Sequence, residues 1–424
     1  MGDGLRKGTK PAGQRTSAAK SLFIETYYTA FLIPVWKLNA AHVLGLASLG
    51  VVMGNWLKRK LPLLDRLNIP APIAGGMVYA LLALGLRDRV LNFEADVVLR
   101  DLLMVAFMTT VGLSARLRLI REGGLGVIWL LAIASAGAVI QNLLGIGLAA
   151  ALHVDPRLGI LTGSVALAGG PATALAFGPV FEKMGVPGAT AAAFAAATFG
   201  ITVAGLIAGY IGGSLVRRHK LTGAGLRVIG KPGPESRAHL LPTILVMGVS
   251  IGLGSVLSDA IQRHGIILPS YIGAMIVAAI IRNLDDRYGF VRISQPDVTA
   301  LGRIVLYLFI VMALLTLRLW ELAHLALPMV VMLAAQVALC WLMCRTVVFW
   351  IMGRDYEAAV TSAGFCGFML GITSNAMASM EELVEKFGAA PRAFLVVPVV
   401  GAFLIDFTNS LIITAMANWR WLSR

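Results

Sequence analysis

The sequence predicts an all-α polytopic membrane protein with two inverted repeats of five transmembrane helices, each repeat containing a re-entrant hairpin. Three observations predict this fold class: the composition, ten apolar runs, and short motifs that recur in the second half of the chain at a nearly constant separation. Of the 424 residues, 58% are hydrophobic and only 14% are charged, and the mean hydropathy is +0.81. A soluble domain contains about 25% charged residues, so this composition excludes a soluble globular protein.

The net charge is +14, because 36 Lys and Arg residues stand against 22 Asp and Glu residues. In a soluble protein this surplus would suggest a nucleic-acid partner. Here the surplus lies in short loops, where positive charge sets the orientation in the membrane. No nucleic-acid partner is therefore expected.

Residues 1–38 precede the predicted core. Residues 1–20 are polar and basic and are expected to form a flexible arm. The segment 21–36 is apolar and aromatic but barely long enough to span a bilayer. It is either an interfacial helix or an eleventh span.

Ten apolar runs follow, separated by charged residues, Pro or Gly. They cover residues 39–57, 71–86, 102–115, 125–152, 188–216, 240–262, 268–281, 300–317, 325–352 and 393–416. Two further stretches, 158–180 and 358–380, are too hydrophobic for loops. Gly, Pro and small polar residues interrupt them too often for ordinary spanning helices.

The two halves of the chain resemble each other. Pro70-Ala-Pro-Ile-Ala returns 199 residues later as Pro269-Ser-Tyr-Ile-Gly. Glu182-Lys-Met-Gly returns 203 residues later as Glu385-Lys-Phe-Gly, and each copy follows one of the interrupted stretches. Echoes in the same order at nearly one spacing predict an internal repeat.

The predicted units are residues 39–216 and 240–424, joined by a basic linker at 217–239. Five crossings in each unit force the two units into opposite orientations. If residue 39 starts outside, the cytoplasmic segments hold 21 of the 36 Lys and Arg residues. This agrees with the positive-inside rule, so the linker is expected in the cytoplasm.

Irregular backbone at membrane depth survives only where protein or water surrounds it, because lipid offers no hydrogen-bond partner. A matched pair of interrupted segments in inverted repeats indicates the binding site of a transporter. Both are expected to be re-entrant hairpins whose helix N-termini can face an anion and whose free carbonyls can coordinate a small cation. The candidate binding residues are Ser164, Gly169, Gly170, Pro171, Thr173, Gly364, Cys366, Gly367, Thr373, Ser374 and Asn375.

Polar residues within the predicted spans are a second clue, since a charge at the bilayer centre costs about 2.5–3.5 kcal/mol on insertion scales. Asp406 lies near the middle of the last crossing, with Asn409 on the same helix face. This pair either ligates a cation, supports a hairpin tip or locks two helices together. Gln141 and Asn142 lie mid-span in the fourth crossing and are expected to satisfy opened backbone or to serve helix packing.

The three cysteines, Cys340, Cys344 and Cys366, lie in apolar or Gly-rich stretches. No disulfide framework is expected, and their spacing does not match a zinc site. The six histidines have no ligand spacing, and the sequence contains neither a His-Glu-x-x-His zinc helix nor a Walker loop. We therefore expect no enzyme, no cofactor and no metal beyond a transported ion.

Several long motifs resemble those of the bacterial sodium/glutamate symporters. They include the run from Arg392 to Asn409, Ala196-Ala-Thr-Phe-Gly200, Gln141-Asn-Leu-Leu-Gly-Ile-Gly and Pro70-Ala-Pro-Ile-Ala-Gly-Gly76. The resemblance covers about residues 40–416 and implies a homodimer in the bacterial inner membrane, whose hairpin-bearing domains move past a scaffold in elevator fashion. It implies import of glutamate or a related small carboxylate driven by sodium, with no cofactor besides the transported ion.

The resemblance also carries binding roles onto Gly170, Thr173, Gly367 and Thr373. Where the family reads Gly-Gly-His-Gly-Thr and Gly-His-Cys-Gly-Phe, this chain has Pro171 and Phe365 in place of the two histidines. Two alternatives therefore stay open. One is a proton-coupled or differently specific organic-anion transporter, and the other is a substrate sensor that does not transport.

Overall fold

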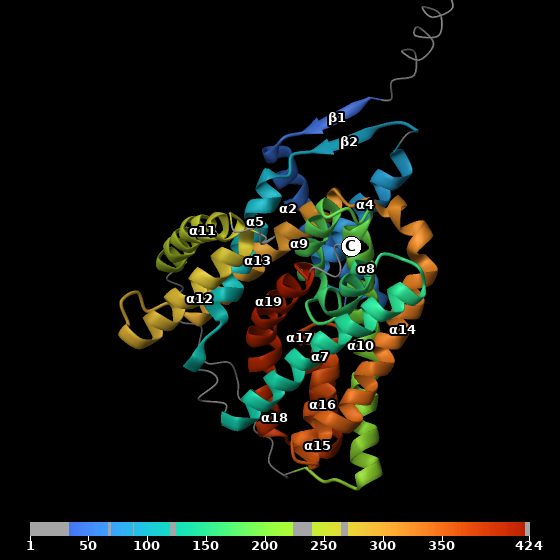
Figure 1. Ribbon diagram of the computed structural model, residues 1–424, viewed down its shortest axis with the longest axis vertical. Helices are drawn as coiled ribbons and strands as arrows, with labels where there is room; N and C mark the ends of the chain where they lie inside the picture. Colours follow the sequence, from blue (N-terminus) through green and yellow to red (C-terminus); the bar gives the residue numbers. More distant parts are fainter. Residues whose placement is uncertain are drawn as a thin grey trace, which may run out of the picture.

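The computed structural model describes residues 34–66, 69–87, 89–118, 124–223, 240–263 and 270–419. The predicted arm at 1–20, most of the 21–36 segment and the greater part of the linker lie outside these residues. Within the described ranges the chain is helical, apart from one small sheet (Figure 1).

All ten apolar runs form helices. They are α2 (Ala40–Lys60), α4 (Ala71–Leu86), α5 (Val98–Ser114), α7 (Gly124–Ala151), α10 (Ala189–His219), α11 (Leu240–Gln262), α12 (Ser270–Tyr288), α13 (Gln295–Leu315), α14 (Ala326–Met343) continued by η3 (Cys344–Val348) and α15 (Phe349–Ile351), and α18 (Pro391–Val399) continued by η4 (Val400–Leu404) and α19 (Ile405–Ala417). Seven helices of the described chain are long and apolar enough to cross a membrane, while α4 is apolar but shorter. The chain is a multi-pass membrane protein.

The two interrupted stretches each form a pair of helices joined by a short turn. The first pair is α8 (Arg157–Ile160) with η1 (Leu161–Val165), followed by α9 (Gly170–Lys183), and the second is α16 (Tyr356–Met369) with α17 (Thr373–Phe387). Within each pair the two arms pack against each other. Gly163 breaks the first arm, because its φ of −92° and ψ of −127° are not helical.

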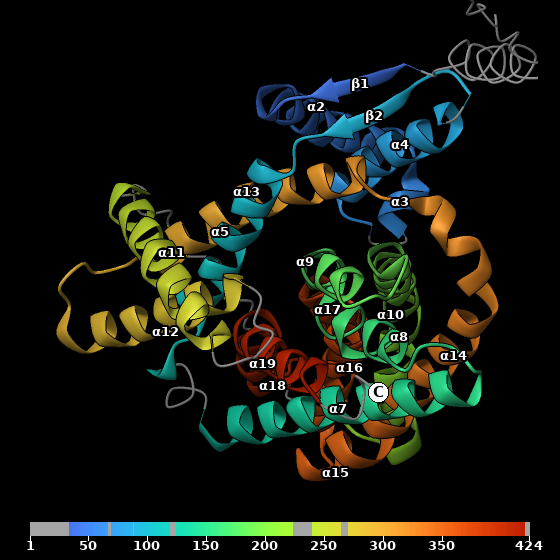
Figure 2. The ribbon, with the colours of Figure 1, turned by 45° about the horizontal axis from the view of Figure 1, so that its top comes forward.

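The helices form two bodies (Figure 2). The outer body contains α2, α4, α5, α11, α12 and α13, which pack on one another. The hairpin body contains both helix pairs together with α7, α10, α14, α18 and α19. The short connection α3 (Pro62–Arg66) belongs to the outer body, and η2 (Leu319–Leu325) leads from α13 to α14.

Two helix crossings in the outer body match each other in sequence position. Gly54 of α2 lies directly against the backbone of Ala71 and Gly75 in α4. Gly254 of α11 lies in the same way against the backbone at Gly273 in α12. A Cβ atom at either glycine would collide with the neighbouring backbone, so small residues permit both crossings.

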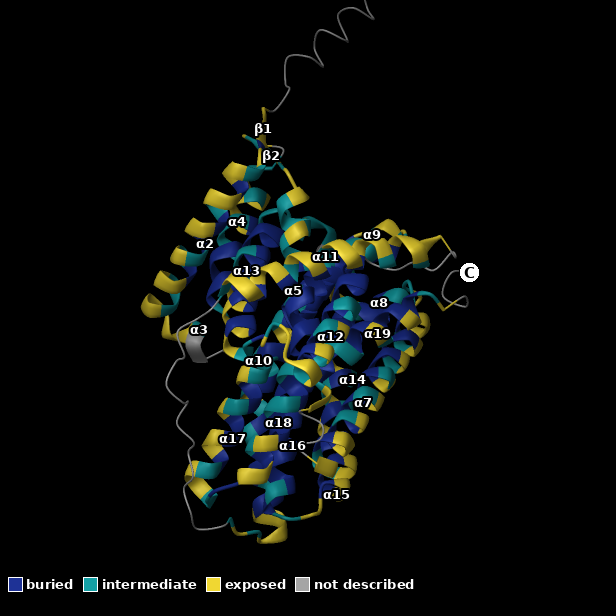
Figure 3. Cartoon of the chain, turned by 90° about the vertical axis from the view of Figure 1, so that its left-hand side faces the viewer, coloured by how far each residue is buried: buried dark blue, intermediate teal, exposed yellow. Residues whose placement is uncertain are grey.

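A two-stranded parallel sheet closes one end of the outer body. Strand β1 (Val35–Leu38) pairs with β2 (Asn92–Ala95), with Val35 opposite Asn92. The sequence predicted helix up to residue 36, and this is wrong for residues 35 and 36, because their backbone groups pair with β2 rather than along a helix. Buried residues concentrate at the centre of the hairpin body, whereas α2 and α11 are exposed along much of their length (Figure 3).

Candidate functional site

The turns of both helix pairs line one cavity of about 650 Å³ between the two bodies. The predicted binding residues that line it are Gly169, Pro171, Thr173, Thr373 and Ser374, and Asp406, predicted as a cation or hairpin-support residue, lines it too. Residues from α2, α4, α5 and α13 form the opposite wall. Two segments about 200 residues apart in the chain therefore line one cavity.

The first turn is shaped by Gly170, the opening residue of α9. Its φ of +67° lies in the left-handed region, which favours glycine. A Cβ atom here would lie 3.3 Å from Cγ2 of Ile372 and 3.5 Å from the carbonyl oxygen of Gly371 in the second turn. The two turns are thus in close contact, and Gly170 lies at that contact.

The second turn is attached to the last membrane-spanning helix. The hydroxyl of Thr373 donates a 2.8 Å hydrogen bond to the carbonyl of Gly401. Gly401 lies in the π-helical turn η4, which follows Pro398 inside the helix. Because a proline has no N–H and a π-helical turn shifts the hydrogen-bond register, this helix offers carbonyl groups to the hairpin.

The broken arm of the first pair is held by two buried asparagines. The backbone N–H of Ser164 donates to Oδ1 of Asn142 at 2.8 Å, and Nδ2 of Asn409 donates to the carbonyl of Ser164 at 2.9 Å. Asn142 comes from α7 and Asn409 from α19. Backbone groups that the break at Gly163 withdraws from the helix are therefore paired by side chains.

A second chain of amides supports the other pair. Nε2 of Gln141 donates to the carbonyl of Met369 at 3.1 Å, and Nε2 of Gln336 donates to the carbonyl of Gln141 at 2.6 Å. Nδ2 of Asn375 donates to the carbonyl of Ile201 in α10 at 2.7 Å. The side chains of Gln141 and Asn142 thus form hydrogen bonds with backbone groups of the two hairpins. This was one of the two roles expected for them.

Several buried oxygen atoms around these contacts have no hydrogen-bond partner among the described residues. They are Ser164 Oγ, Asn409 Oδ1, Gln141 Oε1, Gln336 Oε1 and Asn375 Oδ1. The carboxylate of Asp406, in the cavity wall, likewise has no hydrogen bond or ion pair within the described ranges. Unpaired buried acceptors are costly unless a ligand or water satisfies them.

Six predicted binding residues are not among those that line the cavity. One of them, Gly170, lies at the contact between the two turns. Gly364 and Gly367 are buried in α16, where they let Met380, Val397 and Ala376 approach. Ser164 and Asn375 are buried in the contacts described above, and Cys366 points into the hairpin body. The sequence identified the helix pair correctly but not which helix face borders the cavity, because α16 is buried on all sides.

Other cavity residues were missed. Asn55, Lys58 and Arg303 line it from the outer body, and Phe368 and Gly401 line it from the hairpin body. The proline within the last apolar run was a readable signal for the opened helix at Gly401. No sequence pattern marks the three outer-body residues as cavity residues, because they reach the cavity only through the packing of the two bodies.

A second cavity of about 650 Å³ lies at the other end of α4. The N-terminal residues Ala71 and Ile73 of α4 line the first cavity, whereas Ala83 and Arg87 near its C-terminus line the second. Helix α9 borders both cavities, with Thr173 facing the first and Pro179 the second. The first hairpin thus stands between two cavities.

Comparisons with known proteins agree on one family. The family model described as sodium/glutamate symporter matches residues 36–389. A sodium/glutamate symporter of Escherichia coli (strain K12) is 38% identical over 393 residues, which cover 89% of this chain and 97% of that protein. One of Haemophilus influenzae is 34% identical over 392 residues, with the same coverage of each chain.

A search of solved structures finds the sodium proton antiporter MjNhaP1 from Methanocaldococcus jannaschii, which shares 15% sequence identity and has a TM-score of 0.40. The match covers 90% of this chain and 97% of that one. The family model and both relatives cover most of the chain. The chain belongs to the sodium/glutamate symporter family.

Proposed function

We propose that this protein imports glutamate or a related small carboxylate across the bacterial inner membrane by symport with sodium. The observation that carries the proposal is the meeting of two helix N-termini, at Gly170 of α9 and Thr373 of α17, beside one cavity. The sodium/glutamate symporters among its relatives support the choice of substrate and ion.

The two helix N-termini are suited to a carboxylate. The first N–H groups of a helix have no partner within it, and the helix dipole makes this end positive. Thr173 and Thr373 add hydroxyls to the cavity wall, and Lys58 and Arg303 add positive charge from the outer body. Such a site favours an anion. The carboxylate of Asp406 can bind the ammonium group of a substrate or a cation.

Sodium requires oxygen ligands, and the hairpin body contains unpaired ones. Ser164 Oγ and Asn409 Oδ1 are both buried without a partner among the described residues, and the same two residues are joined by the hydrogen bond from Asn409 to the Ser164 carbonyl. We therefore place the sodium site at the break of the first hairpin. Asp406, one helical turn before Asn409, lines the cavity and supplies negative charge.

The proposed transport cycle moves the hairpin body past the outer body. The inverted repeat of 39–216 and 240–424 and the matched crossings at Gly54 and Gly254 support a symmetrical scaffold. The cavity at the hairpin turns borders Lys58 and Arg303, which the charge distribution assigns to the cytoplasmic side. The site is then open to the cytoplasm, and closure of that cavity with opening of the second gives the outward-open state. The family resemblance adds a homodimer to this proposal.

The residues that replace the two family histidines affect specificity. Pro171 lines the cavity at the start of α9. Phe365 is buried and packs edge-on against Phe368, with ring centroids 5.4 Å apart, and Phe368 lines the cavity. The replacement at Pro171 removes a hydrogen-bonding group from the cavity wall, and the one at Phe365 removes such a group from behind it. A substrate that is related to glutamate but makes fewer polar contacts therefore fits the proposal.

Ligand-dependent thermal stabilisation of the purified protein tests the proposal without a transport assay. Stabilisation grows with the ratio of ligand concentration to dissociation constant. We expect glutamate to raise the unfolding temperature in sodium and not in potassium. A shift with another carboxylate only would move the proposal to that substrate, and shifts of equal size in both salts would remove sodium coupling.

Proton coupling is the second candidate, because the Asp406 carboxylate lies in the cavity wall without a partner among the described residues. A protonatable group at a substrate site inside a membrane protein is typical of proton-coupled carriers. Uptake that a protonophore abolishes at a constant sodium gradient would favour this candidate. A protein that binds substrate but shows no counterflow would instead be a sensor.

A further inference from the structure

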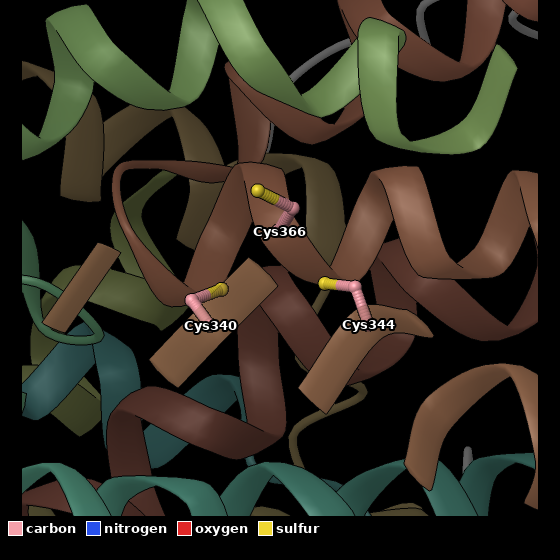
Figure 4. A group of neighbouring side chains, drawn as sticks. All are labelled: Cys340, Cys344 and Cys366. Carbon is pink, nitrogen blue, oxygen red and sulfur yellow. The ribbon is translucent and has the colours of Figure 1, made fainter. Parts of the chain in front are cut away.

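The three cysteines of the chain meet in the interior of the hairpin body (Figure 4). The Sγ atoms of Cys340, Cys344 and Cys366 all lie within 4.8 Å of one another. Their residues are 2%, 0% and 0% exposed. These are all the cysteines that the sequence contains, so the chain gathers every thiol it has at one buried point.

Two elements build this cluster, which we name the three-thiol cluster. Cys340 and Cys344 are four residues apart where α14 passes into η3, so their side chains lie on the same helix face. Cys366 comes from α16, the first arm of the second hairpin. In the sequence only Cys340 and Cys344 have helical spacing, and no pattern indicates that Cys366 lies beside them.

The chemistry of the three-thiol cluster is that of a soft-metal site. Thiolate sulfur atoms select Cu(I) and zinc over hard cations. Zinc almost always takes four ligands, whereas among the described residues this group offers three ligand atoms and includes no carboxylate or imidazole. Cu(I) accepts three sulfur ligands in a trigonal arrangement, which three sulfur atoms from two helices can supply.

Charge balance in the apolar interior also favours a monovalent ion. All three cysteines belong to the main hydrophobic core, where an uncompensated charge is costly. If Cu(I) displaces one thiol proton to solvent, the resulting thiolate balances the single positive charge of the ion, and the site stays neutral overall. A divalent ion in the same site needs two deprotonated thiols for neutrality and still lacks a fourth ligand.

We propose that Cys340, Cys344 and Cys366 form a binding site for one Cu(I) ion that ties the second hairpin to α14. The ion joins an arm of the hairpin to a membrane-spanning helix within the hairpin body. Metal binding therefore stabilises the folded state by linkage and resists any separation of α16 from α14.

The test uses the purified full chain under anaerobic conditions, titrated with Cu(I) against a chromophoric Cu(I) chelator. We expect one Cu(I) per chain with only sulfur in its first coordination shell by X-ray absorption. Cys366→Ala and Cys344→Ala, on different helices, should each weaken Cu(I) binding at least tenfold. Two variants are used so that a folding defect in one leaves the other informative, and thermal unfolding verifies that each is folded.

Ser362→Ala is the matched control. Ser362 is buried on α16 one turn before Cys366, and within the described part of the chain its hydroxyl donates only to the carbonyl of Ala358 in the same helix. Its Cu(I) affinity should equal that of the unmodified chain. Unchanged affinity in both alanine variants, or preference for Zn(II) over Cu(I), would overturn the assignment. Because the readout is metal affinity, a failure here leaves the proposed symport untouched, and a failure of symport leaves this site untouched.

Discussion

The amide oxygen of Asn142 accepts a 2.8 Å hydrogen bond from the backbone N–H of Ser164, at the point where the first hairpin is broken. A side chain from α7 thus takes the place of a helical carbonyl. Asn409 pairs the carbonyl of the same residue from the other side. The irregular backbone on which the proposed site depends is held by amides from two membrane-spanning helices.

Asn142→Ala should lower the stability of the protein by about 1–3 kcal/mol, because the buried Ser164 N–H loses its acceptor. Thermal unfolding in detergent without ligand measures the change. Asn55→Ala is the matched control, since among the described residues the exposed Asn55 donates only to the carbonyl of Val51 in its own helix. Equal unfolding temperatures for the two variants would contradict the assigned role of Asn142.

Asp406→Asn should reduce sodium-dependent uptake at least tenfold while the unfolding temperature stays the same or rises. The amide has nearly the same shape, and no hydrogen bond or ion pair of the described residues is lost. Removal of a charge from the membrane interior also removes its desolvation cost. Asp101→Asn is the control, because Asp101 pairs with Arg100 outside the hairpin body. A variant at position 406 that still couples uptake to sodium would exclude Asp406 from the ion path.

Gly170→Ala should lower the free energy of unfolding by about 1–2 kcal/mol, because Gly170 has a left-handed backbone conformation. It should also weaken substrate binding. The added methyl group would press on Ile372 across the contact between the two turns. Gly85→Ala, on α4, is the control, because no atom lies within 4 Å of its added Cβ. Both variants are compared by thermal unfolding with and without glutamate. An unchanged substrate shift in Gly170→Ala would contradict the proposed role of this turn.

Gly54→Val and Gly254→Val should each destabilise the outer body, by about 1–3 kcal/mol or more, because overpacking forces the backbones apart. Gly45→Val in α2 and Gly248→Val in α11 are the controls, since both glycines have open space around them. Thermal unfolding compares each pair. If only one crossing proves sensitive, the two crossings are not equivalent, and the structural support for the inverted repeat is lost.

The sequence predicted the helical spans and the helix pairs well, for physical reasons that particular residues make clear. Long apolar runs can only be membrane-spanning or core helices, and Gly163, Gly169 and Gly371 mark interruptions that helices tolerate poorly. Thr173 and Thr373 follow directly after the turns, so the prediction of the turns also placed them at the cavity.

The rest of the site depends on contacts that sequence spacing does not encode. Gly367 was expected at the cavity, but in a helix that is buried all round, as α16 is, no polarity pattern indicates which face borders a ligand. Asn375, on α17, was also expected there, but its side chain donates to the carbonyl of Ile201 in α10 instead. Arg303 reaches the site only because α13 lies opposite the hairpin turns. The three-thiol cluster likewise needs α16 to pack on α14, which places Cys366 beside Cys340.

Glutamate uptake into proteoliposomes is the most direct test of sodium-coupled symport. Vesicles containing the purified protein are diluted into buffer with labelled glutamate under an inward sodium gradient or under an equal potassium gradient, each with and without a protonophore. Sodium-coupled symport predicts accumulation against the glutamate gradient with sodium, whether or not the protonophore is present, and none with potassium. Accumulation that is equal in the two salts, or that disappears with the protonophore at a constant sodium gradient, would contradict sodium-coupled symport.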